Sequence, residues 1–207
     1  MARVIAADLA GACDDAVDVL RSGGVVVIPT DTVYGLAVLP NHADAINRVF
    51  ALKQRPAGMH LPVLVAGSHQ LRLVTGDTRP AVRTLAERFW PGALTMVVAN
   101  ATPLTDGLGN GDGTVGVRCP DHELIRSIAE VVGAVAATSA NLHGRPTPDA
   151  ADEVADQLPG VDLVIDGGIC AGGQASTVVS LTGPVPEVLR AGPITAADIV
   201  DIWQAGG

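Results

Sequence analysis

The strongest constraint on the fold is an alternation between short apolar segments and longer segments with helical spacing. Short apolar runs bounded by Gly, Pro or Asp are typical of buried strands, whereas apolar residues three and four positions apart, as in Ile46, Val49 and Phe50, indicate a helix face. The pattern predicts strands over residues 25–29, 61–65, 94–99, 114–118, 134–138, 163–166, 177–181 and 185–190, and helices over 14–22, 43–53, 80–90, 122–132, 147–157 and 195–204.

Crossover helices and a hairpin occur together in this pattern. Helices between strands favour parallel pairing, while the short connection between 177–181 and 185–190 is typical of an antiparallel hairpin. We therefore predict an α/β fold in which a twisted mixed sheet is flanked by helices. No linker or repeat divides the chain, so we expect one domain over residues 1–207, with a core of about 14–193 and a last helix at about 195–204.

Several helix ends carry recognisable signals. Gly23 and Gly24 are expected to end the first helix, and Pro80 suits a first helical turn. Asp121 is a good N-cap for the helix that follows it. Thr195, with an acidic residue three positions later at Asp198, resembles a capping box.

Composition excludes several classes of protein. With 48% apolar and 17% charged residues the chain can bury a core, and none of its apolar runs reaches the roughly 18 residues that span a bilayer. We expect a cytoplasmic protein without membrane contact. The net charge of −9 disfavours a long electrostatic footprint on nucleic acid. Cys13, Cys119 and Cys170 form no CxxC pair, so neither a zinc cluster nor a disulfide framework is supported.

The first candidate site follows the predicted strand 25–29. The segment PTDTVYGLA places two Thr hydroxyls, including that of Thr32, beside a carboxylate and the only tyrosine, Tyr34. Open sheets bind ligands at the carboxyl ends of their strands. A turn closed by an Asx hydrogen bond explains Asp31 but not the whole cluster.

The second candidate is Lys53-Gln54-Arg55-Pro56, at the end of a predicted helix. Twelve of the 13 basic residues are Arg and Lys53 is the only lysine, which favours a site that needs a compact cation against phosphate. The alternative is a solvated cation that interacts with the helix dipole.

Small polar residues also follow the strand 134–138. Ser139 and Asn141 offer neutral donors to an anionic ligand. Ser139 as a nucleophile is disfavoured because the GxSxG and SxxK spacings are absent, and Asn141 has an alternative interpretation as a left-handed turn residue.

Two arginines lie at strand ends. Arg118 and Arg190, together with Ser176 and Thr177, suit an anionic substrate because guanidinium binds carboxylate and phosphate bidentately. Each alone is also compatible with a surface position. The glycine-rich run 107–113 lacks GxGxxG spacing and is interpreted as a loop, and no P-loop or HExxH motif exists, so no metal ligands are predicted.

Together these motifs resemble those of the YrdC-type threonylcarbamoyl-adenylate synthases (TsaC family). The resemblance runs from about residue 25 to 193 and includes PTDTVYGLA, KQRP, FWPGALT, TVGVR, SAN followed by HGRP, STVV and LRAG. It implies a YrdC-like twisted sheet with a concave basic cleft, in the short form without a C-terminal extension. Met59 and Leu64 depart from the pattern of some members, which have Asn and His there.

The resemblance implies a reaction in which L-threonine, bicarbonate or CO2, and ATP give threonylcarbamoyl-AMP and pyrophosphate, for the modification of tRNA to N6-threonylcarbamoyladenosine. Carried over residue by residue, it places four positions around threonine: Thr32, Arg118, Ala137 and Ser176. It places seven on the nucleotide: Lys53, Arg55, Thr114, Ser139, Asn141, Thr147 and Arg190. Lys53 and Arg55 are the expected catalytic pair.

Other components follow from the same chemistry. Mg²⁺ is expected to accompany ATP without a protein cage. The expected partners are the downstream enzymes of tRNA threonylcarbamoylation, with a weak tRNA contact allowed. Two alternatives stay open: an RNA-binding or ribosome-assembly module without catalysis, and a carbamoyl-transfer domain like that of hydrogenase-maturation proteins.

Overall fold

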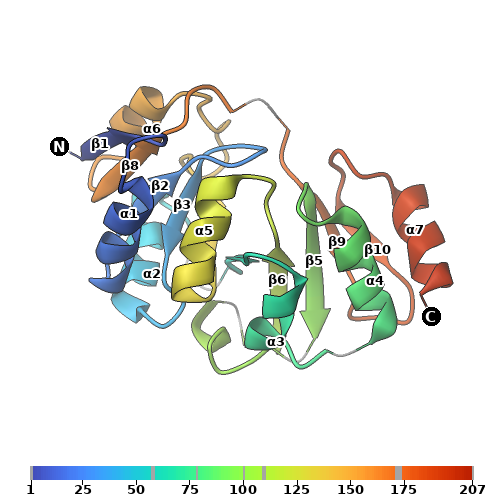
Figure 1. The fold of residues 1–207 in the computed structure, drawn as a ribbon. Coiled ribbons are helices and arrows are strands. Elements are labelled where there is room, and N and C mark those ends of the chain that lie inside the picture. The colour runs from blue at the N-terminus through green and yellow to red at the C-terminus, as the bar shows by residue number, and fades with distance from the viewer. Residues whose placement is uncertain are drawn as a thin grey trace.

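The computed structural model describes residues 2–56, 59–77, 79–99, 101–108, 111–170 and 174–206. Within these residues ten strands form one mixed sheet with helices packed against it (Figure 1), as the α/β prediction requires. The strands are β1 (Arg3–Ala6), β2 (Val26–Ile28), β3 (Gly35–Val38), β4 (Val63–Leu64), β5 (Leu94–Ala99), β6 (Thr114–Arg118), β7 (Val135–Ser139), β8 (Leu163–Asp166), β9 (Thr177–Ser180) and β10 (Glu187–Arg190). The helices are α1 (Ala12–Arg21), α2 (Ala43–Leu52), α3 (Leu71–Val74), α4 (Pro80–Phe89), α5 (Glu123–Val132), α6 (Ala151–Gln157) and α7 (Ala196–Ala205).

The strand order brings distant motifs together. It is β1-β8-β2-β3-β7-β4-β6-β5-β9-β10, with parallel pairs β1/β8, β8/β2, β4/β6 and β5/β9 and antiparallel pairs elsewhere. Gly35 in β3 pairs with Ser139 in β7, and Leu64 in β4 pairs with Arg118 in β6. Three of the predicted motifs therefore lie within the four consecutive strands β3-β7-β4-β6: PTDTVYGLA, SAN and TVGVR.

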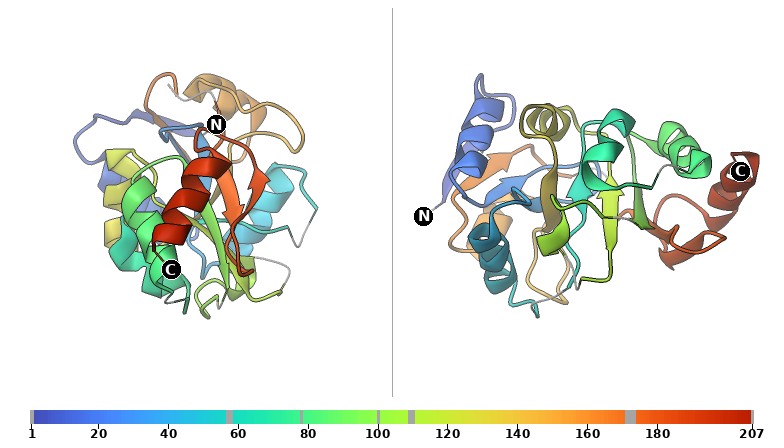
Figure 2. Two further views of the ribbon diagram at one scale, coloured as in Figure 1. Left: turned by 90° about the vertical axis from the view of Figure 1, so that its right-hand side faces the viewer. Right: turned by 90° about the horizontal axis from the view of Figure 1, so that it is seen from below.

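The helices divide between the two faces of the sheet. The view from below shows α1, α5, α3 and α4 in a row along one face (Figure 2). On the other face α2 contacts β3 and α6 contacts β8, at the end of the sheet that contains the N-terminus. At the opposite end α7 packs against α4.

Two apolar clusters hold these layers together. One lies beneath α1 and α5 and includes Leu20, Ile28 and Ile128, each 0% exposed. The larger cluster continues under α4 and α7 and includes Leu85, Met96 and Ile199. Full burial of each such aliphatic side chain contributes about 1.5–3 kcal/mol.

Alternation along β5 separates core from cavity. Leu94, Met96 and Val98 are completely buried in the core, whereas Thr95 and Val97 line a cavity on the other face. The same period of two places Val115 and Val117 of β6 in the core and the intervening residues on the cavity side. The strands therefore form both a core wall and the floor of a pocket.

Some local predictions are confirmed. The capping interaction at Thr195, the first-turn position of Pro80 and the antiparallel β9–β10 hairpin are all observed. Gly23, at φ 80°, follows the end of α1.

Other local predictions are wrong. α5 begins after His122, so Asp121 is not its N-cap, and α6 begins at Ala151 rather than near Thr147. β1 and β3 were not predicted. Among the described residues, every helix is too short or too polar to cross a membrane.

Candidate functional site

A cavity of about 700 Å³ opens over strands β4, β5, β6, β7 and β9. This volume is in the range of small-molecule sites. All eleven side chains or backbone positions predicted from the sequence line it: Thr32, Lys53, Arg55, Thr114, Arg118, Ala137, Ser139, Asn141, Thr147, Ser176 and Arg190. The structure thus brings the whole predicted set together, while the role of each residue stays a prediction.

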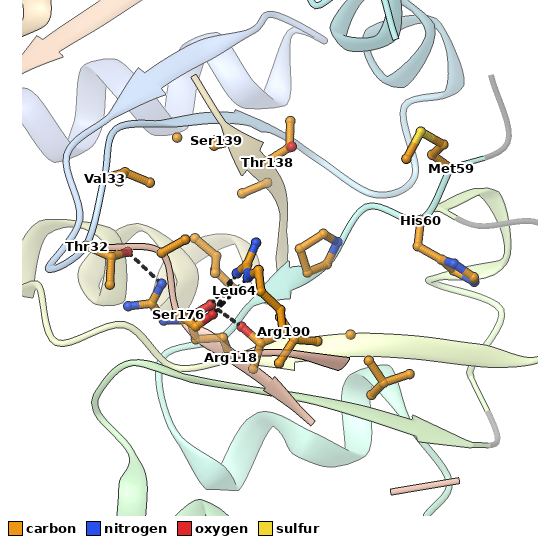
Figure 3. A pocket seen from close by; sticks show the side chains of 18 of the residues that line it. Thr32, Val33, Met59, His60, Leu64, Arg118, Thr138, Ser139, Ser176 and Arg190 are labelled. Atoms are coloured by element: carbon orange, nitrogen blue, oxygen red, sulfur yellow. Dashed lines mark hydrogen bonds between the residues drawn. The ribbon is translucent and has the colours of Figure 1, made fainter. Parts of the chain in front are cut away.

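Arg118 lies at the inner side of this cavity and is held from three directions. Its Nη2 donates to Asp31 Oδ1 at 2.7 Å, its Nη1 to Thr32 Oγ1 at 2.8 Å, and its Nε to the Gly92 carbonyl at 2.9 Å. The residue is only 7% exposed, so it is not a surface arginine. Asp31 neutralises part of its charge, and Thr32 is fixed beside it (Figure 3).

Thr30 shapes the turn that presents Thr32. Its hydroxyl accepts from the backbone N–H groups of Thr32 and Val33 at 3.1 and 3.2 Å and donates to the Val33 carbonyl at 2.7 Å. Tyr34 follows, fully buried, with its hydroxyl donating to the Gly168 carbonyl and accepting from Gly167 N–H. Burial raises the pKa of Tyr34 to about 12, so the phenol stays neutral and serves structure.

Arg190 and Ser176 form a second polar group in the cavity. Arg190 Nε and Nη2 both donate to the Ser176 carbonyl, at 3.0 and 2.8 Å, and Nη2 also donates to Ser176 Oγ at 3.0 Å (Figure 3). Thr95 Oγ1 lies 2.8 Å from the same Ser176 hydroxyl oxygen. Arg118 lines the same cavity, and burial lowers its pKa although Asp31 opposes that effect.

Lys53 follows α2 and reaches the segment after β7. Its ammonium donates to the carbonyls of Ser139 and Asn141 and to Asn141 Oδ1, the last two at 2.8 and 2.9 Å. The residue is 2% exposed, so the alternative of a solvated helix-end cation is wrong. Burial, followed by the charge of Arg55, lowers the pKa of Lys53 to about 8. Contact between this ammonium and a phosphate would require exchange of one of its three bonds.

Ser139 and Asn141 are fixed by the same network. Ser139 Oγ donates to Asn141 Oδ1 at 2.6 Å, and the Asn141 amide donates to the carbonyls of Leu142 and Arg145. Among described non-glycine residues only Gln54 has a positive φ, so Asn141 is not a left-handed turn residue. Within the described part of the chain no His or carboxylate is hydrogen-bonded to Ser139, and nothing there activates it as a nucleophile.

Arg55 and Thr114, which were predicted from the sequence, contact polar residues outside the predicted set. Arg55 donates to Thr138 Oγ1 at 3.2 Å and to the His60 carbonyl at 3.1 Å. Asp112 Oδ1 accepts from the Thr114 hydroxyl at 2.8 Å and lies 3.2 Å from His60 Nε2.

The two remaining predicted positions are Ala137 and Thr147. Ala137 in β7 donates its N–H to the Pro62 carbonyl, and Thr147 lines the cavity ahead of α6. The lining also holds polar residues outside the predicted set: Thr30, Tyr34, His60, Thr95, Asp112, Thr138, His143, Ser180 and Thr182. Thr30, Tyr34 and Thr138 lie in segments that the sequence already singled out. Among the others, Thr95 carried a usable signal, since a period of two places it opposite the buried Leu94 and Met96.

Charge in the described lining is mainly positive. Lys53, Arg55, Arg118 and Arg190 face one carboxylate, that of Asp112. Such a set suits a ligand with several anionic groups. The net potential of the cleft stays a prediction. Met59 and Leu64, the departures noted above, line the cavity with an apolar surface (Figure 3).

Comparisons with known proteins agree with this site. The sequence profile of the Sua5/YciO/YrdC family, described as telomere recombination, matches residues 18–192. A threonylcarbamoyl-AMP synthase of Bacillus subtilis is 39% identical over 183 residues, covering 87% of this chain and 53% of the relative. A protein of Mycobacterium tuberculosis named putative threonylcarbamoyl-AMP synthase is 36% identical over 188 residues, covering 90% of this chain and 87% of the relative.

The fold has solved counterparts. The crystal structure of Pyrococcus abyssi Sua5 complexed with L-threonine superposes with a TM-score of 0.89 at 33% identity, covering 98% of this chain and 60% of that one. This chain therefore spans little more than half the length of the Bacillus and Pyrococcus relatives. The profile match and the identity to relatives of similar length show that the chain belongs to the Sua5/YciO/YrdC family.

Proposed function

We propose that this protein is an L-threonylcarbamoyladenylate synthase, a nucleotidyltransferase that converts L-threonine, bicarbonate or CO2, and ATP into threonylcarbamoyl-AMP and pyrophosphate. The observation that carries the proposal is the convergence of four cationic side chains and a set of fixed hydroxyls in one cavity. Family relatives named threonylcarbamoyl-AMP synthase, and the threonine complex of the Pyrococcus protein, support it.

The proposed reaction requires the site to hold several anionic groups together, and it does not require a nucleophile from the protein. The threonine amine adds to CO2 and loses a proton, giving a carbamate. A carbamate oxygen then attacks the α-phosphorus of ATP, the bond to the bridging oxygen breaks, and pyrophosphate leaves. Positioning and electrostatic stabilisation are sufficient for such a step.

The residues divide into two groups in this proposal. Thr32, Arg118, Ala137 and Ser176 surround threonine. Arg55, Thr114, Ser139, Thr147 and Arg190 contact the nucleotide, while Lys53 fixes Ser139 and Asn141 through its three hydrogen bonds and contributes its charge.

Mg²⁺ accompanies ATP in this proposal, neutralising phosphate charge. The described residues hold no group of three or more His, Cys, Asp or Glu side chains that would form a separate cage. The cavity's donors and cations suit the phosphate oxygens, so the ion is taken as part of the ATP substrate.

The chemistry of the proposed product indicates which enzymes would use it. A carbamoyl-adenylate is an activated donor, so the proposal includes cytoplasmic transfer to tRNA by downstream threonylcarbamoylation enzymes, with at most a weak tRNA contact by this chain.

Pyrophosphate release tests the reaction. Because the nucleophile requires both the amine and the carbon, release from ATP should need threonine and bicarbonate together. Equal release with either omitted would contradict the mechanism. Salt-sensitive RNA binding without release would favour the RNA-binding module instead.

A further inference from the structure

Thr95 lies beneath the polar group formed by Ser176 and Arg190. It comes from β5, and Ser176 immediately precedes the parallel neighbour β9, where Leu94 pairs with Thr177. The two hydroxyl oxygens are 2.8 Å apart, and Thr95 and Ser176 are 6% and 5% exposed. Both residues line the cavity, so their hydroxyls face the ligand space from the strand floor.

One hydroxyl hydrogen of the Thr95–Ser176 pair has no acceptor among the described residues. The two hydroxyls carry one hydrogen each, and only one of these can lie between the two oxygens. Ser176 Oγ also accepts from Arg190 Nη2 at 3.0 Å. Among the described residues no acceptor takes the second hydroxyl hydrogen, so the pair has one donor left over for the cavity.

The surroundings decide what that donor meets. Arg190 is bonded to Ser176, and Arg118 lines the same cavity. Two guanidinium groups beside a free hydroxyl hydrogen favour an anionic oxygen as the acceptor. A hydroxyl that accepts from a cation is also the better donor, because hydrogen bonds in a chain polarise one another. The favoured direction is therefore from Thr95 to Ser176, and from Ser176 to the ligand.

We propose that Thr95 is a positioning residue that directs the Ser176 hydroxyl hydrogen towards an anionic oxygen of the substrate. In the proposed division of the site that oxygen belongs to the threonine carboxylate. An ATP phosphate has the same acceptor chemistry and is the alternative that the experiment distinguishes. The inference rests on the proposed function for the identity of these ligands. Thr95 does not contact the ligand itself. It affects ligand affinity by orienting the Ser176 hydroxyl.

Calorimetric titration of L-threonine and, separately, of Mg-ATP tests the proposal. Thr95→Ala should weaken the ligand whose oxygen meets Ser176 by about 3- to 10-fold, the effect of one neutral hydrogen bond, and leave the other ligand unchanged. Weaker threonine binding identifies the carboxylate, and weaker Mg-ATP binding identifies the phosphate. Thr95→Ser, which keeps the hydroxyl, should stay within about twofold of wild type.

A double-mutant cycle separates positioning from general damage to the fold. In a Ser176→Ala background, Thr95→Ala should have no further effect on affinity, because Thr95 acts through that hydroxyl. Thr84→Ala, at a half-buried position of α4 outside the cavity lining, is the matched control and should bind both ligands normally.

Different outcomes would refute the role of Thr95 and the proposed function. Unchanged affinity of Thr95→Ala for both ligands, or an equal loss in the Ser176→Ala background, would overturn the role of Thr95. Failure of the wild-type protein to bind either ligand would refute the proposed function itself.

Discussion

Replacement of Lys53 is the most informative single perturbation of the site. Its ammonium makes three hydrogen bonds to Ser139 and Asn141 and the residue is 2% exposed. Lys53→Ala removes all three donors, and the Asn141 carbonyl then keeps no hydrogen-bond partner among the described residues. Ser139 and Asn141 keep the bond between their own side chains at 2.6 Å, so the segment is loosened rather than released.

The magnitude follows from these contacts. A hydrogen bond to a charged group contributes about 1.5–3 kcal/mol, but the three share one donor and two residues and are not additive. We expect Lys53→Ala to cost about 2–4 kcal/mol in transition-state stabilisation, a fall in kcat/KM of about 30- to 1000-fold. Lys53→Arg should also lower kcat/KM substantially, because a planar fork does not fit three acceptors arranged around one nitrogen.

Steady-state kinetics with thermal melts on both variants provide the assay. Arg48→Ala is a matched control because Arg48 is an exposed cation on the same helix, paired with Asp162 at 2.9 Å. It should lose no more than about 1 kcal/mol of stability and keep its activity. Full activity in folded Lys53→Ala and Lys53→Arg proteins would refute the argument that the ammonium organises the site.

Four further predictions concern the cavity and the residues that support it. Because the pKa of Lys53 is about 8, kcat/KM should fall as pH rises through about 8 and the ammonium is lost. Lys53 should raise the free energy of unfolding as pH rises from about 8 to 10.5, because the folded protein releases a proton there that the unfolded chain keeps. If the wild-type protein instead loses stability over this range relative to Lys53→Ala, the burial argument is contradicted. Ser139→Ala should weaken nucleotide use and leave measurable turnover, and an acyl- or phospho-Ser139 adduct in intact-mass spectra would show the opposite role. Asp31→Asn should lower the free energy of unfolding by about 1–3 kcal/mol in urea titrations, because the buried Arg118 keeps its acceptor but loses its counter-charge; an unchanged midpoint would show that this ion pair adds no stability.

The sequence predicted which residues line the cavity more completely than it predicted the strands of the sheet. The hydroxyl, amide and cationic residues stood out because they lie next to predicted strands or, for Lys53 and Arg55, at the end of a predicted helix. β3 (Gly35–Val38) was not predicted because its four residues continue the PTDTVYGLA motif, which we interpreted as a ligand-binding turn. It is nevertheless a central strand, paired with both β2 and β7.

Long-range pairing could not be deduced from local pattern. Lys53 and Ser139 are 86 residues apart, and they meet only because the order β3-β7-β4 places the end of β7 near the end of α2. The burial of Lys53 was unpredictable for the same reason, since helix spacing places it at a terminus where cations are usually solvated. The start of α5 shows the reverse case, in which Asp121 offers a good local signal but the N-cap is His122.

Product identity tests the central claim most directly. The protein is incubated with ATP, Mg²⁺, ¹³C-bicarbonate and ¹⁵N-threonine, and the nucleotide products are resolved by mass spectrometry. The proposed reaction predicts one adenylate that carries both labels and appears together with pyrophosphate. An adenylate that contains threonine without the labelled carbon, or no labelled adenylate at all from the folded protein, would contradict it.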